Sequence, residues 1–306
     1  MRSFVLETKN LLKKYKEQTV INQVNIHLRP GRIYGLLGRN GAGKTTIMKM
    51  ILGLTSITSG EISVFGQNLL GNEKNIYPRI GSLIERPGFY PNLTGEENLK
   101  VFSKLRGTIS KDAVKKALDA VGLPYNDKKP FSQYSLGMKQ RLGIANAIMN
   151  DPELLILDEP SNGLDPIGIA SIRDFVRTLS RQGKTILISS HNLSEIALMA
   201  DDIGIIHKGI LLEESSYMEL EKKNRKYIFL CVSSSSEAIR ILEQQFGISD
   251  YLIDSDRTIR IYETDRNPAE LNYALTTNNI DVSALQVCND SLEDYFKKIT
   301  GGEGIA

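Results

Sequence analysis

The sequence of 306 residues predicts an α/β fold built on a parallel sheet, followed by a small α+β domain. Two observations support this prediction. Up to about residue 213, short apolar runs alternate with segments of helical pattern, and such strand-then-helix repetition builds parallel sheets. From about residue 225 the predicted order becomes strand, helix, two strands, helix, strand and a last helix, which is typical of a ferredoxin-like domain.

Four apolar runs in the first region have the composition of buried strands. They are short, rich in β-branched residues and bounded by Gly, Asp or Ser. They are IYGLLG (33–38), LLILDE (154–159), TILISS (185–190) and DIGIIH (202–207). The intervening segments GKTTIMKMILGL, GMKQRLGIANAIMN and IASIRDFVRTLSRQG predict helices.

In the second region, KYIFLCV predicts a strand and SSSEAIRILEQQFG a helix, with Ser234 as its cap three residues before Glu237. DYLIDSDRTIRIYE predicts two strands around a polar turn. NPAELNYALTTNN predicts a helix, DVSALQV a strand and SLEDYFKKIT the last helix.

Composition narrows the class of protein. The hydrophobic content of 41% is ordinary for a globular chain, and the net charge of +2 gives no electrostatic reason to expect nucleic-acid binding. No apolar run approaches the roughly 20 residues that cross a bilayer, and the N-terminus lacks the pattern of a signal peptide. The isolated Cys231 and Cys288 predict two buried, reduced side chains rather than a metal site.

A phosphate-binding loop is the first functional motif. GRNGAGKTT fits G-x-x-x-x-G-K-[ST] between a predicted strand and a predicted helix. Its glycines let backbone N–H groups surround a phosphate at the positive end of the helix dipole. Lys44 would reach the β- and γ-phosphates, and the Thr45 hydroxyl would bind Mg²⁺. The predicted phosphate-binding residues are Gly38, Arg39, Asn40, Gly41, Ala42, Gly43, Lys44, Thr45 and Thr46.

The run LLILDEP brings two adjacent carboxylates to the end of a predicted strand. Asp158 would hold Mg²⁺ through water, and Glu159 would orient the attacking water or take its proton. Adjacent carboxylates at a strand end are often only a solvated turn, but the phosphate-binding loop upstream favours the catalytic interpretation.

Together with further motifs, these residues resemble the ATPase domains of ABC transporters, a class of P-loop NTPase. YSLGMKQRLGIA is similar to the family signature usually written LSGGQ: it keeps Ser135, Gly137 and Gln140, whereas Leu136 and Met138 depart from the usual residues. In the family, the signature helix offers its N-terminus to a phosphate held by another subunit. The resemblance therefore implies a head-to-tail dimer with two ATP molecules between the subunits.

Three single residues follow from the same resemblance. SNGLDP is similar to the D-loop, which implies that Asp165 crosses the dimer interface. His191 ends a predicted strand like the family's switch histidine, which contacts the γ-phosphate; a purely structural hydrogen bond is the alternative. Tyr15, expected before the first β-hairpin, resembles the aromatic residue that stacks on adenine; an ordinary strand aromatic is the alternative.

Glu85 ends the predicted strand IGSLIE, where most of the family has a glutamine that contacts Mg²⁺ and the catalytic water. The segment IERPGFYPNLTGEENL is similar to the bacitracin and lantibiotic self-immunity branch, which carries Glu there. The resemblance implies that Glu85 is a metal ligand coupled to a helical subdomain, with Phe89, Tyr90 and Leu93 lining a groove for a permease helix. The alternatives are a solvent-exposed loop acid and aromatic rings packed on the subdomain itself.

The resemblance also implies an overall organisation. Residues 1–215 would form an ABC-type ATPase domain with a helical subdomain at about 86–150, and residues 225–306 a C-terminal accessory domain. Lys44, Glu159 and His191 would be catalytic, with ATP and Mg²⁺ as cofactors. The implied function is the ATPase subunit of an exporter for peptide-antibiotic immunity or resistance, and a general drug, lipid or ion exporter is the alternative.

The implied partners are an integral membrane permease and a second ATPase subunit, identical or paralogous. The chain would lie at the cytoplasmic face of a bacterial membrane and contact the membrane only through the permease. A soluble ABC protein acting on DNA or ribosomes is the other alternative. DNA-acting types carry a long coiled coil or a zinc insert between the phosphate loop and the signature, whereas this chain has about 90 residues there, without heptads or Cys pairs. Ribosome-acting types carry two ATPase cassettes in one chain, whereas this chain has one. A cassette that only binds ATP is disfavoured by the intact Lys44, Asp158, Glu159 and His191.

Overall fold

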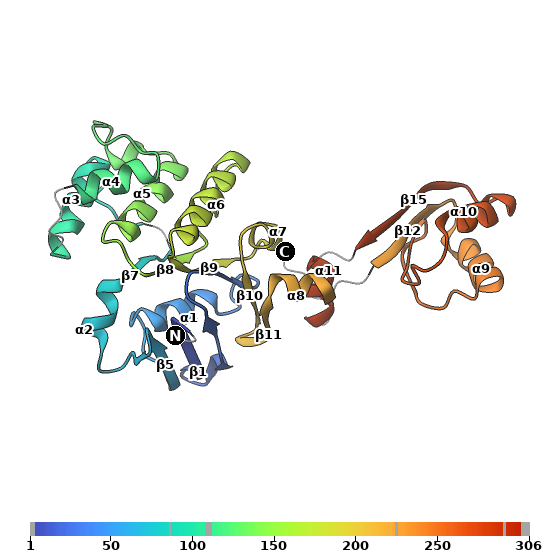
Figure 1. Ribbon diagram of the computed structural model, residues 1–306, viewed down its shortest axis with the longest axis horizontal. Coiled ribbons are helices and arrows are strands. Elements are labelled where there is room, and N and C mark those ends of the chain that lie inside the picture. Colours follow the sequence, from blue (N-terminus) through green and yellow to red (C-terminus); the bar gives the residue numbers. More distant parts are fainter. Residues whose placement is uncertain (1–3, 86, 108–111, 224–225, 290–291, 301–306) are drawn as a thin grey trace. The chain divides into compact units, whose positions relative to one another are not determined.

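The computed structural model describes residues 4–85, 87–107, 112–223, 226–289 and 292–300 (Figure 1). The chain divides into two compact units, with the boundary between Tyr217 and Met218. In the described part of the chain, no helix combines the length and the apolar character that crossing a bilayer requires.

A six-stranded sheet in the order β11-β10-β4-β9-β8-β7 forms the centre of the first unit. Its strands are β4 (Ile33–Leu37), β7 (Ile80–Leu83), β8 (Leu154–Asp158), β9 (Thr185–Ser190), β10 (Asp202–His207) and β11 (Ile210–Ser216). All neighbours pair in parallel except β11, which returns antiparallel at the edge. The four apolar runs predicted as strands are confirmed to within a residue at their ends. The predicted strand IGSLIE is confirmed as β7, but β7 ends at Leu83, two residues before Glu85.

Every residue of β4, β8 and β9 is buried. Figure 1 shows why: α1 (Lys44–Ile51) lies on one side of the sheet, and α5 (Leu136–Ile148), α6 (Pro166–Arg181) and α7 (Leu193–Ala197) lie on the other. A parallel sheet covered on both faces needs continuous apolar strands, which explains the short apolar runs in the sequence.

A second, antiparallel sheet shares the core with α1. It comprises β1 (Leu6–Tyr15), β2 (Gln18–Val24), β3 (His27–Leu28), β5 (Ser59–Val64) and β6 (Gln67–Asn68). The sequence analysis expected only a hairpin here. Tyr15 lies inside that hairpin, opposite Gln18, rather than before it.

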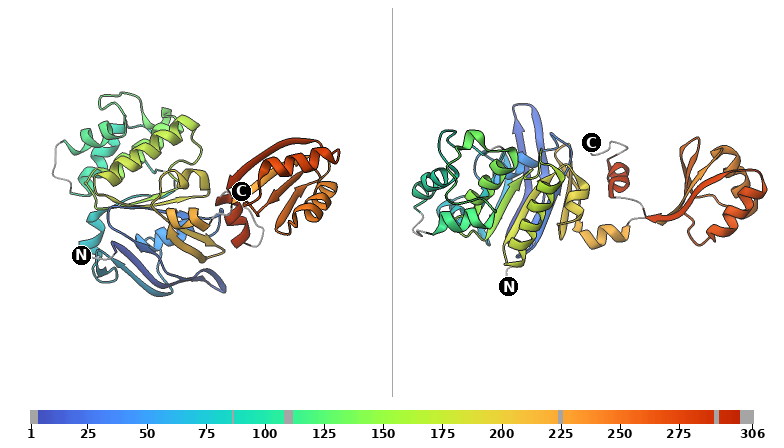
Figure 2. Two further views of the ribbon diagram at one scale, coloured as in Figure 1. Left: turned by 45° about the vertical axis from the view of Figure 1, so that its right-hand side comes forward. Right: turned by 90° about the horizontal axis from the view of Figure 1, so that it is seen from above.

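The segment between β7 and β8 is mostly helical. Its helices are α3 (Gly95–Leu105), α4 (Ala113–Ala120) and α5, and they lie together in Figures 1 and 2. The Phe89 ring packs edge-on against Phe102 and Phe131, with centroids 5.4 and 5.2 Å apart, and is only 8% exposed. The expectation that Phe89 lines a docking groove is therefore wrong, because the ring fills the interior of this helical layer. Tyr90 remains half exposed.

Short helices complete the first unit: α2 (Glu73–Ile76), η1 (Tyr77–Arg79) and η2 (Phe131–Gln133). Helix α8 (Tyr217–Lys223) begins at the boundary between the units. The second unit continues with β12 (Lys226–Val232), α9 (Ser235–Phe246), β13 (Tyr251–Ser255), β14 (Thr258–Ile261), α10 (Pro268–Thr277), β15 (Val282–Asn289) and α11 (Leu292–Ile299).

The four strands of the second unit form an antiparallel sheet in the order β13-β14-β12-β15. With α9 and α10 inserted between the strands, this is the predicted ferredoxin-like arrangement, which is confirmed. Ser234 caps α9 as predicted, its hydroxyl accepting a hydrogen bond from the Glu237 amide at 3.5 Å.

Alternation along β12 directs Ile228, Leu230 and Val232 into the core of the second unit. Cys231 therefore lies on the opposite face. Cys288 of β15 shares that face because it pairs with Tyr227 of β12. Both thiols are free and half-buried. The expectation of two buried cysteines is wrong because they lie on the sheet face away from the core.

Candidate functional site

The loop between β4 and α1 wraps closely around the start of the helix. Gly41 and Gly43 have φ values of 81° and 110°, a region that favours glycine. At Gly38 an added Cβ would lie 2.4 Å from the carbonyl oxygen of Ile206, so no side chain fits there. The glycine spacing of the motif thus produces a compact turn at the positive end of α1.

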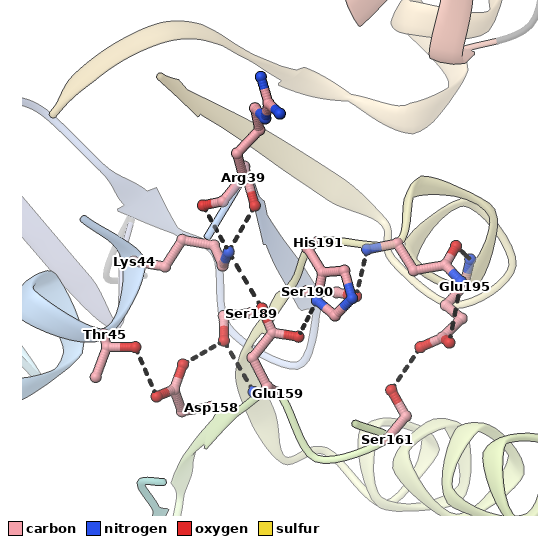
Figure 3. A network of polar contacts seen from close by, with 12 residues as sticks. Arg39, Lys44, Thr45, Asp158, Glu159, Ser161, Ser189, Ser190, His191 and Glu195 are labelled. Atoms are coloured by element: carbon pink, nitrogen blue, oxygen red, sulfur yellow. Dashed lines mark hydrogen bonds and ion pairs between the residues drawn. The ribbon is translucent and has the colours of Figure 1, made fainter. Parts of the chain in front are cut away.

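Lys44 lies at the centre of this loop and is almost entirely buried. Its ammonium donates hydrogen bonds to the carbonyl oxygens of Gly38 at 2.5 Å and Arg39 at 3.2 Å (Figure 3). The same Nζ lies 3.1 Å from Oε1 of Glu159. A phosphate oxygen approaching Lys44 would therefore compete with the Glu159 carboxylate for this ammonium.

Asp158 ends β8 with both carboxylate oxygens occupied. Its Oδ2 accepts a hydrogen bond from the Thr45 hydroxyl at 2.8 Å, and its Oδ1 accepts one from the Ser189 hydroxyl at 2.6 Å. The structure thus brings together Thr45 and Asp158, two of the three residues predicted to hold a metal. One carboxylate with a neighbouring hydroxyl fits Mg²⁺, which takes few protein ligands and otherwise binds water and phosphate oxygens.

Glu159 follows directly and leaves the strand through a left-handed turn, with φ at 47°. Its amide donates to the Ser189 hydroxyl at 2.9 Å. Its Oε2 lies 2.8 Å from His191 Nδ1 (Figure 3). Its buried Oε1 forms the ion pair with Lys44 without hydrogen-bond geometry. The three predicted catalytic residues, Lys44, Glu159 and His191, are therefore joined through one carboxylate.

Four residues near this network were not predicted: Ser161, Ser189, Asn192 and Glu195. Ser189 contacts both neighbouring carboxyl residues, as described above. Ser161 donates to Oε2 of Glu195 at 2.5 Å, and the Glu195 amide donates to Asn192 Oδ1 at 3.2 Å. Ser189 of TILISS is level with Asp158 of LLILDE, and it could have been found only by aligning the two strands.

Glu85 lies two residues beyond β7 with a φ of 56°. Its side chain is 62% exposed, and Oε1 accepts a hydrogen bond from Lys49 of α1 at 2.5 Å. This hydrogen bond raises the pKa of Lys49. The hydrogen-bond partner of Glu85 is thus Lys49, and among the described residues no recorded hydrogen bond or ion pair joins Glu85 to Thr45 or Asp158.

Tyr15 presents a half-exposed ring at the end of β1. The buried Lys13 places its ammonium 4.6 Å from the ring centroid, and the Tyr15 hydroxyl lies 3.2 Å from the Thr55 hydroxyl. A ring supported from the protein side and open to solvent is suited to stacking on a planar base.

The signature residues and Asp165 form a separate group. Ser135 caps α5 by accepting a hydrogen bond from the Met138 amide at 3.2 Å, and Asp165 caps α6 by accepting one from the Gly168 amide at 2.8 Å. Gln140 is buried, and its Oε1 has no hydrogen-bond partner in the part of the chain that the structure describes. Within the described residues, no recorded hydrogen bond joins these side chains to the network around Lys44.

The two segments of this second group contact each other. A Cβ at Gly163 would lie 2.8 Å from the side chain of Leu136. Leu136 itself is 46% exposed and Ile167, beside the Asp165 cap, is 79% exposed. Two helix N-termini flanked by exposed apolar side chains thus lie on one surface of the first unit.

Comparisons with known proteins identify the family of the chain. The family model described as ABC transporter matches residues 21–162. The chain is 53% identical over 304 residues to the bacitracin transport ATP-binding protein BcrA of Enterococcus faecalis, which covers 99% of this chain and 98% of that protein. It is 46% identical over 213 residues to the lantibiotic transport ATP-binding protein SrtF of Streptococcus pyogenes, covering 70% of this chain and 91% of that protein.

A solved structure of an ATP-binding subunit of an ABC transporter superimposes with a TM-score of 0.64 at 29% identity. It covers 72% of this chain and 92% of the solved chain.

Proposed function

The chain belongs to the ATP-binding proteins of ABC transporters, and from this premise we propose that it drives a separate membrane permease that exports peptide antibiotics. As a member of this family it is an ATPase. The observation that carries the proposal is the single carboxylate of Glu159, held between Lys44 and His191 beside the Asp158–Thr45 pair.

We propose the following division of labour in the site. Lys44 and the loop amides bind the phosphates, while Thr45 and Asp158 hold Mg²⁺, which neutralises charge on the phosphate oxygens when bound. Glu159 orients the attacking water or accepts its proton, since its carboxylate already lies in the network. His191 shares that carboxylate and so is placed to respond to the γ-phosphate.

We also propose that two chains form a head-to-tail dimer, each completing the other's site. Ser135 and Asp165 lie outside the network around Lys44, and their helices begin with exposed apolar side chains. Covering Leu136 and Ile167 would be favourable, and the N-terminus of α5 would then face a phosphate held by the partner.

We also propose a domain organisation and a cargo for the chain. Residues 1–215 would be the ATPase domain and residues 225–306 an accessory domain. The names of the bacitracin and lantibiotic relatives, and Glu85 at the position where most of the family has glutamine, favour immunity or resistance to peptide antibiotics. The chain would then act at the cytoplasmic face of the membrane, held there by its permease.

The Glu159→Gln variant tests the catalytic and dimer proposals together. We expect it to bind ATP but to lose at least about a hundredfold in phosphate release, since it lacks the base. With Mg²⁺ and ATP it should become a dimer by light scattering. Lys44→Ala is the matched control and should neither bind ATP nor dimerise. A Glu159→Gln variant that releases phosphate at the wild-type rate, or remains monomeric with ATP bound, would contradict the proposal.

Cargo is tested in cells. A strain that lacks this chain should become more sensitive to bacitracin-like or lantibiotic peptides, and the wild-type chain but not Glu159→Gln should restore resistance. Unchanged sensitivity to these peptides, with increased sensitivity to unrelated drugs, would instead identify a general drug exporter.

A further inference from the structure

We propose that Ser189 is a positioning residue for ATP hydrolysis: one buried hydroxyl fixes both the metal-binding Asp158 and the catalytic Glu159. The inference rests on the roles proposed above for those two carboxylates. Ser189 lies in β9, outside the phosphate loop and the signature.

The register of the sheet places Ser189 beside Asp158. In the parallel pairing of β8 with β9, Asp158 and Ser189 are direct partners. Paired residues in neighbouring strands project to the same face of the sheet. The Ser189 hydroxyl therefore meets Oδ1 of Asp158 at 2.6 Å while the residue itself is completely buried.

The direction of each hydrogen bond is determined by chemistry. A hydroxyl has one proton to donate, an ionised carboxylate can only accept, and a backbone N–H can only donate. Ser189 must therefore donate to Asp158 and accept from the Glu159 amide, 2.9 Å away. Because Ser189 occupies Oδ1, Oδ2 of Asp158 is directed to Thr45.

The second hydrogen bond acts where the backbone is unusual. Glu159 has a φ of 47°, and a left-handed conformation is costly for a residue with a Cβ. It persists only where its surroundings hold it. The Ser189 hydroxyl binds the amide of this residue, and the turn directs the Glu159 carboxylate toward Lys44 and His191. Loss of the hydroxyl should therefore shift the carboxylate without removing any group that touches the nucleotide.

A purely structural role for Ser189 predicts a different result, and Thr185 on the same strand provides a control. Thr185 lies at the other end of β9, is also buried, and its hydroxyl accepts a hydrogen bond from the Gly31 amide at 3.0 Å. Thr185→Val removes a buried hydroxyl that receives a backbone N–H, as Ser189→Ala does, but far along the strand from both carboxylates.

The experiment compares Ser189→Ala, Ser189→Thr and Thr185→Val in the full chain. The readouts are kcat and KM for ATP, the Mg²⁺ concentration for half-maximal rate, and Tm. We expect Ser189→Ala to lower kcat about tenfold or more and to raise the half-saturating Mg²⁺ concentration, with KM for ATP changed less than about threefold. Ser189→Thr should recover most of the rate. Thr185→Val should lower Tm and leave kcat within about twofold.

Several results would overturn the inference. One is a kcat of Ser189→Ala within twofold of wild type; another is a Ser189→Thr variant as slow as Ser189→Ala; a third is a kcat loss in Thr185→Val equal to that in Ser189→Ala. The proposed function is judged separately by wild-type turnover and its loss in Glu159→Gln. If both hold and Ser189→Ala is fully active, only the role of Ser189 fails.

Discussion

At the residue scale, the Glu85 carboxylate has two candidate partners. In the structure it binds Lys49 on α1 and raises the pKa of that lysine. As a proposed metal ligand it would instead act on Mg²⁺ near Asp158. The ion pair is exposed to solvent, so water screens it and the energetic cost of exchanging one partner for the other is small.

This competition makes two substitutions informative together. Glu85→Ala removes the carboxylate, so we expect it to raise the Mg²⁺ concentration for half-maximal ATPase rate about two- to tenfold. Lys49→Met releases the same carboxylate, so it should leave that concentration unchanged or lower it. A titration of ATPase rate against Mg²⁺ measures both.

If instead Glu85 acts only through Lys49, both variants will change the Mg²⁺ dependence in the same direction. That result would contradict the metal-ligand role and leave a structural ion pair. Export by the complete transporter, assayed in parallel, shows whether each variant changes coupling to the permease as it changes the Mg²⁺ dependence.

Most residues of the candidate site could be predicted, because the spacing of glycine, lysine and carboxylate residues within single segments identifies them. Ser189 was not predictable in this way, since its contact with Asp158 joins residues far apart in sequence and depends on strand register. The prediction that Phe89 lines a docking groove was wrong for a related reason. Whether an aromatic ring after a loop points inward depends on rings contributed by α3 and η2.

At the element scale, the N-termini of α3 and α5 offer a matched pair. Thr94 and Glu97 form a reciprocal capping box on α3, with hydrogen bonds of 2.8 and 3.2 Å. Ser135 caps α5 with a single hydrogen bond. Both caps satisfy helix N–H groups, but only the α5 cap belongs to the proposed trans-acting signature.

We therefore expect Thr94→Ala and Ser135→Ala to lower the unfolding free energy similarly, by about 1 kcal/mol each. Urea denaturation measures this quantity. Only Ser135→Ala should also lower the ATPase rate, by about tenfold or more, because the partner's phosphate loses a hydrogen-bonding group. Equal ATPase rates in the two variants would contradict a role for the α5 N-terminus in catalysis.

The elements themselves differed in how well the sequence predicted them. Buried parallel strands are continuous apolar runs, and all four that were predicted were found. In the antiparallel sheet, by contrast, β1 reads LETKNLLKKY and mixes charged residues with apolar ones because one of its faces is more exposed. The order of the C-terminal strands was predictable because strand–helix alternation of this length allows few topologies.

At the scale of the whole molecule, every proposed site residue precedes the boundary at Tyr217. β11 also completes its pairing with β10 at Ser216. The lantibiotic relative matches 70% of this chain while 91% of its own length is covered, so that relative is shorter than this chain.

We therefore expect a chain ending at residue 217 to keep KM for ATP within about threefold of the full chain and to retain ATPase activity. The reason is that no group of the site and no strand of the central sheet is removed. Steady-state phosphate release at several ATP concentrations measures this. A folded truncated chain that no longer binds ATP would show that the second unit contributes to the site.

The alignment of β9 with β8 has a consequence for quality control. Displacing β9 by one residue would turn Ser189 to the opposite face of the sheet, and displacing it by two would set Leu187 or His191 level with Asp158. Leu187 and His191 carry no hydroxyl, so the two-residue displacement would leave Oδ1 of Asp158 without the hydrogen bond that Ser189 donates. Specific activity per mole of protein is thus also an assay for correctly assembled strands, and a preparation that is well expressed yet sluggish should be checked for mispaired chains before its chemistry is interpreted.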